Sequence, residues 1–260
     1  MTNHLLRPNI PLDPIYPGHP YLSLRKGFDD PLSGAGRSSA EEVPPLKNGK
    51  ALGRYPVIAP GSFQNAVQSV DATLDNGTKI CLRRVRHSDI GQIEKGISEM
   101  SDQSRYLRFF SGSKTMPPSV VERLANVDGI HHLAWGAIKM DGDEQRPIAA
   151  THVFRETENS DSGEFAIAVL DQYHGQGVSR ILMAAMFLDA YCEGISRLQI
   201  DILRSNKKAA GLIKAIGATP SLFEGSTAQY DLVLADAISA LQQMEKPAAI
   251  SDVISAFRTS

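Results

Sequence analysis

Apolar residues follow two periods along the chain from residue 79 onward. Ile90, Ile93, Ile97 and Met100 recur at steps of three and four residues, the spacing of an amphipathic helix over 89–100. Short runs rich in β-forming residues alternate with such stretches. They predict strands over 79–86, 133–140, 148–155, 164–170, 197–203 and 229–234, and further helices over 117–124, 178–192 and 207–216. This order predicts a mixed α/β domain.

One connection in this pattern is suited to binding phosphate. The strand over 164–170 is followed by a turn in which Gly175 and Gly177 are separated by one residue, and a long helix begins near Val178. Glycine lets the backbone come close to a ligand. The first N–H groups of a helix are unpaired, and its dipole favours negative charge there. The alternative is an ordinary strand–helix connection, because a Gly-x-Gly turn alone is a weak signal.

The turn resembles the motif of the Gcn5-related N-acetyltransferase (GNAT) superfamily, Arg/Gln-x-x-Gly-x-Gly/Ala. His174 falls at the Arg/Gln position, Gly177 at the central glycine and Ser179 at the last position, so two of the three fixed positions differ. A second block over 204–218 is similar to the family's Asn-x-x-Ala…Leu…Leu-Gly-Phe segment and contains Asn206.

A third block indicates a branch within the superfamily. Residues 104–110 read Ser-Arg-Tyr-Leu-Arg-Phe-Phe, which resembles the Ser-x-Tyr-Leu-Arg-Phe-Phe run of the bacterial Pat-type protein-lysine acetyltransferases. The three blocks keep the family's order within about residues 79–235. The resemblance implies the GNAT fold, a mixed, mostly antiparallel central sheet with flanking helices.

The resemblance also implies the residues that bind acetyl-CoA. The turn would hold the pyrophosphate, and the backbone of the preceding strand would pair with the pantetheine arm and polarise the thioester carbonyl. Asn206 would contact the pantetheine amide region, although an asparagine here is also a good helix N-cap. The residues implied are Ile167, Ala168, Val169, His174, Gly175, Gln176, Gly177, Val178, Ser179, Arg180 and Asn206.

Glu164 is the candidate catalytic base, because it lies where the resemblance places the carboxylate of Pat-type enzymes. A lysine ammonium has a pKa of about 10.4, so some group must take its proton before attack. The alternative is that Glu164 only marks the solvated start of its strand. Ile213 occupies the position where many relatives carry a tyrosine acid. His131, His132 and His152 are other candidates for proton transfer, and a hydrogen-bonded structural role is the usual one for such histidines.

Composition narrows the class of protein. The chain has 260 residues, 42% of them hydrophobic, and a formal net charge of −2, which gives no electrostatic case for nucleic acid or a membrane surface. We expect no membrane span and no signal peptide, hence a cytoplasmic protein. Cys81 and Cys192 suit buried apolar positions better than a disulfide. No cluster has metal-ligand spacing, so we expect no metal.

The ends of the chain differ from its middle. Ten of the 15 prolines lie between Pro8 and Pro60, several at near-threefold spacing with apolar residues between them. We expect an extension over 1–75, either a flexible leader or an arm that docks on the core or on a second subunit in a homodimer. The acetyltransferase domain would span 76–235, and 236–260 would form a helix with a loose tail.

The function that the resemblance implies is N-acetyl transfer. An acetyl group would move from acetyl-CoA to a primary amine, on a protein lysine or a small molecule, by direct attack in a ternary complex. The alternative is a non-catalytic acyl-CoA-binding module, which the changed residues at the motif positions His174 and Ser179 favour.

Overall fold

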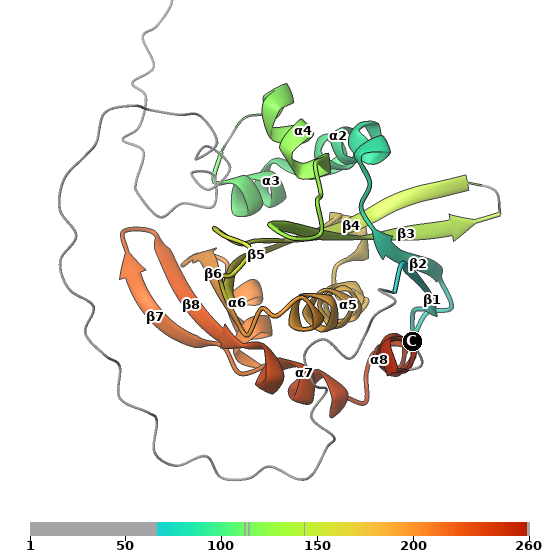
Figure 1. The fold of residues 1–260 in the computed structure, drawn as a ribbon. Coiled ribbons are helices and arrows are strands. Elements are labelled where there is room, and N and C mark those ends of the chain that lie inside the picture. The colour runs from blue at the N-terminus through green and yellow to red at the C-terminus, as the bar shows by residue number, and fades with distance from the viewer. Residues whose placement is uncertain (1–66, 112, 114, 143, 259–260) are drawn as a thin grey trace, which may run out of the picture.

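The computed structural model describes residues 67–111, 113, 115–142 and 144–258 (Figure 1). The proline-rich extension is predicted over 1–75. Residues 1–66 of it, and with them the predicted docking or homodimer contact, lie outside the described residues.

An eight-stranded sheet with helices on both faces forms the described part of the chain. The strand order is β1-β2-β3-β4-β5-β6-β8-β7, and every neighbouring pair is antiparallel except β5 and β6. The prediction of a mixed, mostly antiparallel sheet with flanking helices is therefore confirmed. The strands are β1 Ser69–Thr73, β2 Lys79–Arg84, β3 His132–Asp141, β4 Glu144–Phe154, β5 Ser162–Val169, β6 Arg197–Leu203, β7 Thr219–Glu224 and β8 Thr227–Val233.

The helices divide into two layers (Figure 1). One layer covers the face of β2 to β5 and contains α2 Ile90–Glu99, α3 Asp102–Phe109 and α4 Pro118–Ala125. The other layer contains α5 Val178–Cys192, α6 Lys207–Lys214, α7 Leu234–Gln242 and α8 Ala249–Arg258. The single-turn helices η1 His87–Asp89 and η2 Asp171–Tyr173 precede α2 and the glycine turn.

Helix α5 is the centre of the main core. Eleven of its residues are buried, as expected for a helix with a sheet on one side and α7 and α8 on the other. Its buried carboxylate, Asp189, accepts a 2.7 Å hydrogen bond from Trp135 Nε1 and forms an ion pair with Arg84 on β2. This pairing fixes the helix against β2 and β3, because a buried charge must keep its partners.

Besides helix α8, three strands and helices were not predicted from the sequence, for identifiable reasons. Strand β1 is short and lies within the range predicted for the extension. Helix α3 is mostly polar and buries only Arg105 and Phe109. Strand β7 is an edge strand with every residue exposed, so it carries no alternating pattern.

The C-terminal residues differ from the expected loose tail. Helix α8 buries Ala249, Ile250, Val253, Ile254 and Phe257 in the same core as α5. Strand β1 and helices α7 and α8 thus extend the globular unit beyond both ends of the 76–235 range. Within the described residues, no helix is long and apolar enough to cross a membrane. Cys81 and Cys192 are both free thiols, each only partly buried.

Candidate active site

Strands β5 and β6 separate partway along their length. They are parallel neighbours over only three residue pairs, the last being Glu164 with Gln199. Beyond this pair, β5 continues to Val169 and β6 to Leu203. The far half of β5 therefore has a partner, β4, on one side only, and the sheet is open between β5 and β6.

The alternation of hydrogen bonds shows which backbone groups face this opening. The N–H of Leu170 donates to the carbonyl of Ile148 on the β4 side (2.9 Å), and Thr151 Oγ1 donates to the carbonyl of Ala166 (3.0 Å). Since an antiparallel strand alternates its direction of bonding, Ala168 also turns its backbone toward β4. Ile167 and Val169 turn theirs toward the opening.

The turn after β5 presents a row of backbone donors. Gly175 and Gly177 have φ values of 76° and 85°, the left-handed region that favours glycine, and α5 begins directly after them. For the N–H groups of residues 175–179, no acceptor is found among the residues that the structure describes. Consecutive N–H groups at a helix N-terminus form a site for an anion.

The side chains around the turn differ in their hydrogen bonds: His174 and Gln176 are bonded to other described residues, and Arg180 Nε is not. His174 Nε2 donates to the carbonyl of Val169 (2.9 Å), so this histidine ties the turn to the end of β5. Gln176 bonds to the carbonyl of Gln172 (2.7 Å) and accepts from Asn76 (2.9 Å). Arg180 Nε is buried and has no hydrogen-bond partner in the described part of the chain, which leaves a cationic donor beside the row of N–H groups.

Gly177 is required for space as well as for its backbone angle. A Cβ atom at this position would lie 2.8 Å from Pro247 Cγ and 2.9 Å from its Cβ. The segment before α8 therefore packs directly against the turn, and any side chain at position 177 must displace it.

Two further positions behave as the sequence suggested. Asn206 caps α6, and its side-chain oxygen accepts from the N–H of Ala209 (3.1 Å). Ile213 is buried in the main core, so no acid occupies that position.

Glu164 lies among three ionisable side chains that come from other elements. Burial lowers the pKa of Arg108 on α3 to about 10, and the charge of Glu164 opposes that shift. Burial likewise lowers the pKa of Arg123 on α4, again opposed by Glu164. Burial raises the pKa of Asp201 on β6 to about 6, and Glu164 adds to this rise. Glu164 is therefore at the centre of a charge cluster at the point where β5 and β6 separate.

Two of the three histidines form a buried chain. His132 Nδ1 lies 2.9 Å from the carbonyl oxygen of Asn126, and His132 Nε2 lies 3.0 Å from His152 Nδ1. The ring of His132 stacks on Phe154 with centroids 4.0 Å apart. His131, by contrast, is exposed and pairs with Asp128 (3.1 Å).

A cavity of about 90 Å³ lies between the sheet and the layer of α2, α3 and α4. Its floor includes Gly136, Ala150 and Ala168, which are direct cross-strand neighbours on β3, β4 and β5. His152 and Arg108 line it together with mainly apolar side chains. These apolar residues include Ile97, Met100, Phe109, Leu124 and Leu170.

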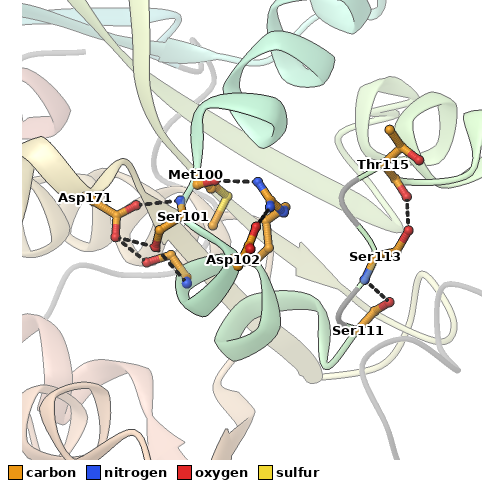
Figure 2. Close-up of polar contacts among 9 residues, drawn as sticks. Met100, Ser101, Asp102, Ser111, Ser113, Thr115 and Asp171 are labelled. Carbon is orange, nitrogen blue, oxygen red and sulfur yellow. Dashed lines mark hydrogen bonds and ion pairs between the residues drawn. The ribbon is translucent and has the colours of Figure 1, made fainter.

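Asp171 ties α3 to the turn (Figure 2). Its carboxylate accepts from the N–H of Ser101 (3.0 Å), from Ser101 Oγ (2.8 Å) and from Ser104 Oγ (2.7 Å). Next to this contact, Arg105 bonds to the carbonyl of Met100 and to Asp102. The helix that carries Arg108 is thus attached directly to Asp171 of η2, four residues before Gly175.

We expect this attachment to stabilise the fold at neutral pH but not in acid. Partial burial opposes ionisation, but the three hydrogen bonds prevail and lower the pKa of Asp171 to about 2. The contribution is present above the unfolded pKa of about 3.9 and is lost as pH falls toward 2. Asp171→Ala should cost about 1–2 kcal/mol at neutral pH, discounted for exposure.

Urea unfolding at several pH values tests this expectation. The difference between Asp171→Ala and the parent should narrow between about pH 4 and pH 2. Ser104→Ala, which removes only one of the three hydrogen bonds, should cost less. An equal difference at every pH would show that the carboxylate charge is not involved.

The sequence pointed to the glycine turn and to Glu164 but not to the groups around Glu164. Arg108 lies in the 104–110 block, which assigns it no role, and no sequence pattern points to Arg123, Asp171 or Asp201. Their positions depend on how α3, α4 and β6 meet, which no local pattern shows.

Comparisons with known proteins agree with this architecture. Residues 104–218 match the family model described as "Acetyltransferase (GNAT) family". Acetyltransferase Pat of Mycolicibacterium smegmatis is 28% identical over 152 residues, covering 58% of this chain and 45% of that protein. Acetyltransferase PA5475 of Pseudomonas aeruginosa is 23% identical over 145 residues, 56% of this chain and 77% of that protein. The match thus spans less than half of the mycobacterial protein.

A solved structure shares the fold. The crystal structure of the GNAT domain of S. lividans PAT superimposes with a TM-score of 0.59 at 24% identity, covering 64% of this chain and 96% of that domain. Residues 104–218 of this chain, with the open β5–β6 pair and the glycine turn at their centre, are similar in sequence to the GNAT acetyltransferase family and to acetyltransferase Pat, and they share the fold of the S. lividans GNAT domain.

Proposed function

We propose that the protein transfers an acetyl group from acetyl-CoA to a primary amine by direct attack in a ternary complex. The observation that carries this proposal is the row of backbone donors at residues 175–179, placed directly after a strand that has separated from its neighbour. An anion site at the end of an open strand fits a ligand that has a pyrophosphate and a long amide-containing arm.

The coenzyme would bind along β5 and over the turn. The N–H groups of residues 175–179 and the guanidinium of Arg180 would hold the pyrophosphate. Ile167 and Val169 would pair with the pantetheine arm through their backbones. The carbonyl of Val169 already accepts from His174, so its N–H is the group that is left for the ligand. Ala168 would contribute its small side chain, and Asn206 would contact the arm while it caps α6.

The chemistry would take place where β5 and β6 separate. A backbone N–H of β5 aimed at the thioester oxygen would stabilise the developing oxyanion, which is worth about 3 kcal/mol in other acyl-transfer enzymes. Glu164 would take a proton from the incoming ammonium, directly or through a water. The amine nitrogen would then attack the carbonyl carbon, and coenzyme A would leave as a thiolate. A thiol pKa of about 8.5 makes this departure feasible without a tyrosine acid.

We infer that a protein lysine is the acceptor. The resemblance of residues 104–110 to the Ser-x-Tyr-Leu-Arg-Phe-Phe run of the Pat-type protein-lysine acetyltransferases supports this class. A small-molecule amine is the other acceptor that the same chemistry admits.

Two measurements test the proposal together. Isothermal titration should show acetyl-CoA binding, and release of free coenzyme A should depend on an added amine, first Nα-acetyl-lysine amide and then lysine-containing peptides. Binding without amine-dependent release would favour a non-catalytic acyl-CoA-binding module. Absence of binding would overturn both functions.

A further inference from the structure

The chain of hydrogen bonds through the two buried histidines leaves a defined nitrogen at the cavity. A carbonyl oxygen only accepts, so the 2.9 Å contact with Asn126 requires a proton on His132 Nδ1. If His132 is neutral, its Nε2 is an acceptor, and the 3.0 Å contact then requires a proton on His152 Nδ1. A neutral His152 in this tautomer keeps an unprotonated Nε2.

Both rings are neutral near pH 7 in this environment. Burial lowers the pKa of His132 to about 4; the carbonyl of Asn126 and the charge of Asp128 oppose the shift, and Arg123 adds to it. Burial also lowers the pKa of His152 well below its usual value, and His132 and Arg108 add to this effect. Neither ring therefore holds a second proton at rest.

The position of His152 relates it to Glu164. His152 is 3% exposed and lines the cavity, and no partner for its Nε2 is found among the residues that the structure describes. Its cross-strand neighbour on β5 is Ala166, two residues after Glu164, so both side chains lie on the same face of the sheet. Arg108 interacts electrostatically with both.

We propose that His152 accepts the second proton of the reaction through Nε2, and that His132 is the residue that positions it. This inference rests on the proposed acetyl transfer. An ammonium must lose two protons to become an amide. Glu164 would take the first, before attack. Attack forms the C–N bond and leaves a cationic nitrogen beside the oxyanion, and that nitrogen would give its proton to His152 Nε2 as the C–S bond breaks. The proton would pass to water when the product leaves.

A weak base suits this step better than a strong one. A nitrogen already bonded to the carbonyl carbon is a stronger acid than a free ammonium, so a neutral imidazole of low basicity can accept its proton. The same low basicity keeps His152 unprotonated and ready for the next cycle.

The experiment removes the Nε2 acceptor of His152 and keeps a donor near the position of its Nδ1. Asparagine places an amide near the Nδ1 position, so His152→Asn should keep the bond to His132 and lose only the acceptor at Nε2. Its kcat for amine-dependent coenzyme A release should fall on the order of 100-fold, with the KM for acetyl-CoA unchanged. His131→Asn, at the exposed neighbouring histidine, should behave as the parent in both.

Nitrogen–proton correlation spectra of the full chain show which ring nitrogen of His152 carries the proton, and so test whether His132 fixes that tautomer. In the parent, the His152 ring should carry its proton on Nδ1, and His132→Phe should remove this preference and lower kcat. Conservation of the fold is checked by thermal unfolding of each variant.

The possible results distinguish a failure of the His152 role from a failure of the proposed acetyl transfer. If the parent releases coenzyme A and His152→Asn matches it, or if His152 carries its proton on Nε2, the role of His152 is refuted and acetyl transfer stands. If the parent binds acetyl-CoA but acetylates no amine, the proposed function is refuted and the role of His152 with it.

Discussion

Replacing Gly177 with glutamate is expected to abolish acetyl-CoA binding. The new carboxylate would lie beside the N–H groups that we assign to the pyrophosphate, and would compete with it for the helix N-terminus. The side chain would also be held at a φ of 85° and would meet Pro247 at 2.8 Å. Isothermal titration of the purified variant with acetyl-CoA should show no binding.

Two further variants separate charge from strain. Gly177→Ala adds only the Cβ, so its effect measures the contact with Pro247 together with the strain of a side chain at a φ of 85°. Gly194→Glu places the same side chain at a φ of 82° at the other end of α5, where nothing lies within 4 Å. It should cost about 1–2 kcal/mol of stability and leave binding intact. A folded Gly177→Glu variant that binds as the parent does would show that the coenzyme site lies elsewhere.

The sequence predicted best the elements whose pattern is local. Helix α5 begins at Val178 and β6 spans Arg197–Leu203, as predicted, because each is bounded by turn residues and carries a strong apolar signal. Strand β7 carries no such signal, since an exposed edge strand has no face to bury. Helix α8 does carry apolar residues at helical spacing. Its place in the core depends on packing against α5, which no local pattern shows.

The candidate site also has a part that the sequence predicts and a part that it does not. The glycine turn could be found because a strand, two glycines and a helix follow one another in the chain. The surroundings of Glu164 could not, because Arg108, Arg123 and Asp201 come from three elements that meet only in the folded sheet. The resemblance places His174 among the coenzyme-binding residues, and in the structure its Nε2 donates to the carbonyl of Val169.

The histidines show that residue type alone does not determine whether a side chain has a structural or a chemical role. His131 and His132 are adjacent in the sequence, yet one is exposed and the other is 5% exposed. Only the strand register brings His132 against His152, through the pairing of β3 with β4. A structural role for His132 and a role in proton transfer for His152 are then compatible, because the first fixes the tautomer of the second.

Replacing Glu164 with glutamine is expected to lower turnover about 10²–10⁴-fold with little change in the affinity for acetyl-CoA. Glutamine keeps the size of the side chain and one oxygen but cannot accept a proton at neutral pH. The coenzyme groups that we assign lie farther along β5 and in the turn, so their contacts should remain. Turnover is measured as amine-dependent release of coenzyme A, and affinity by isothermal titration.

The dependence on pH distinguishes a base from a structural carboxylate. Without Glu164, only amine molecules that have already lost their proton can attack, and this fraction grows as pH approaches the lysine pKa of about 10.4. The deficit of Glu164→Gln should therefore shrink from about pH 6 to pH 9, whereas the loss of the electrostatic interaction with Arg108 or Arg123 would give a deficit that does not follow the ionisation of the amine. Glu158→Gln, at an exposed position in the loop before β5, should match the parent throughout. Turnover by Glu164→Gln equal to that of the parent across this range would exclude Glu164 as the first proton acceptor.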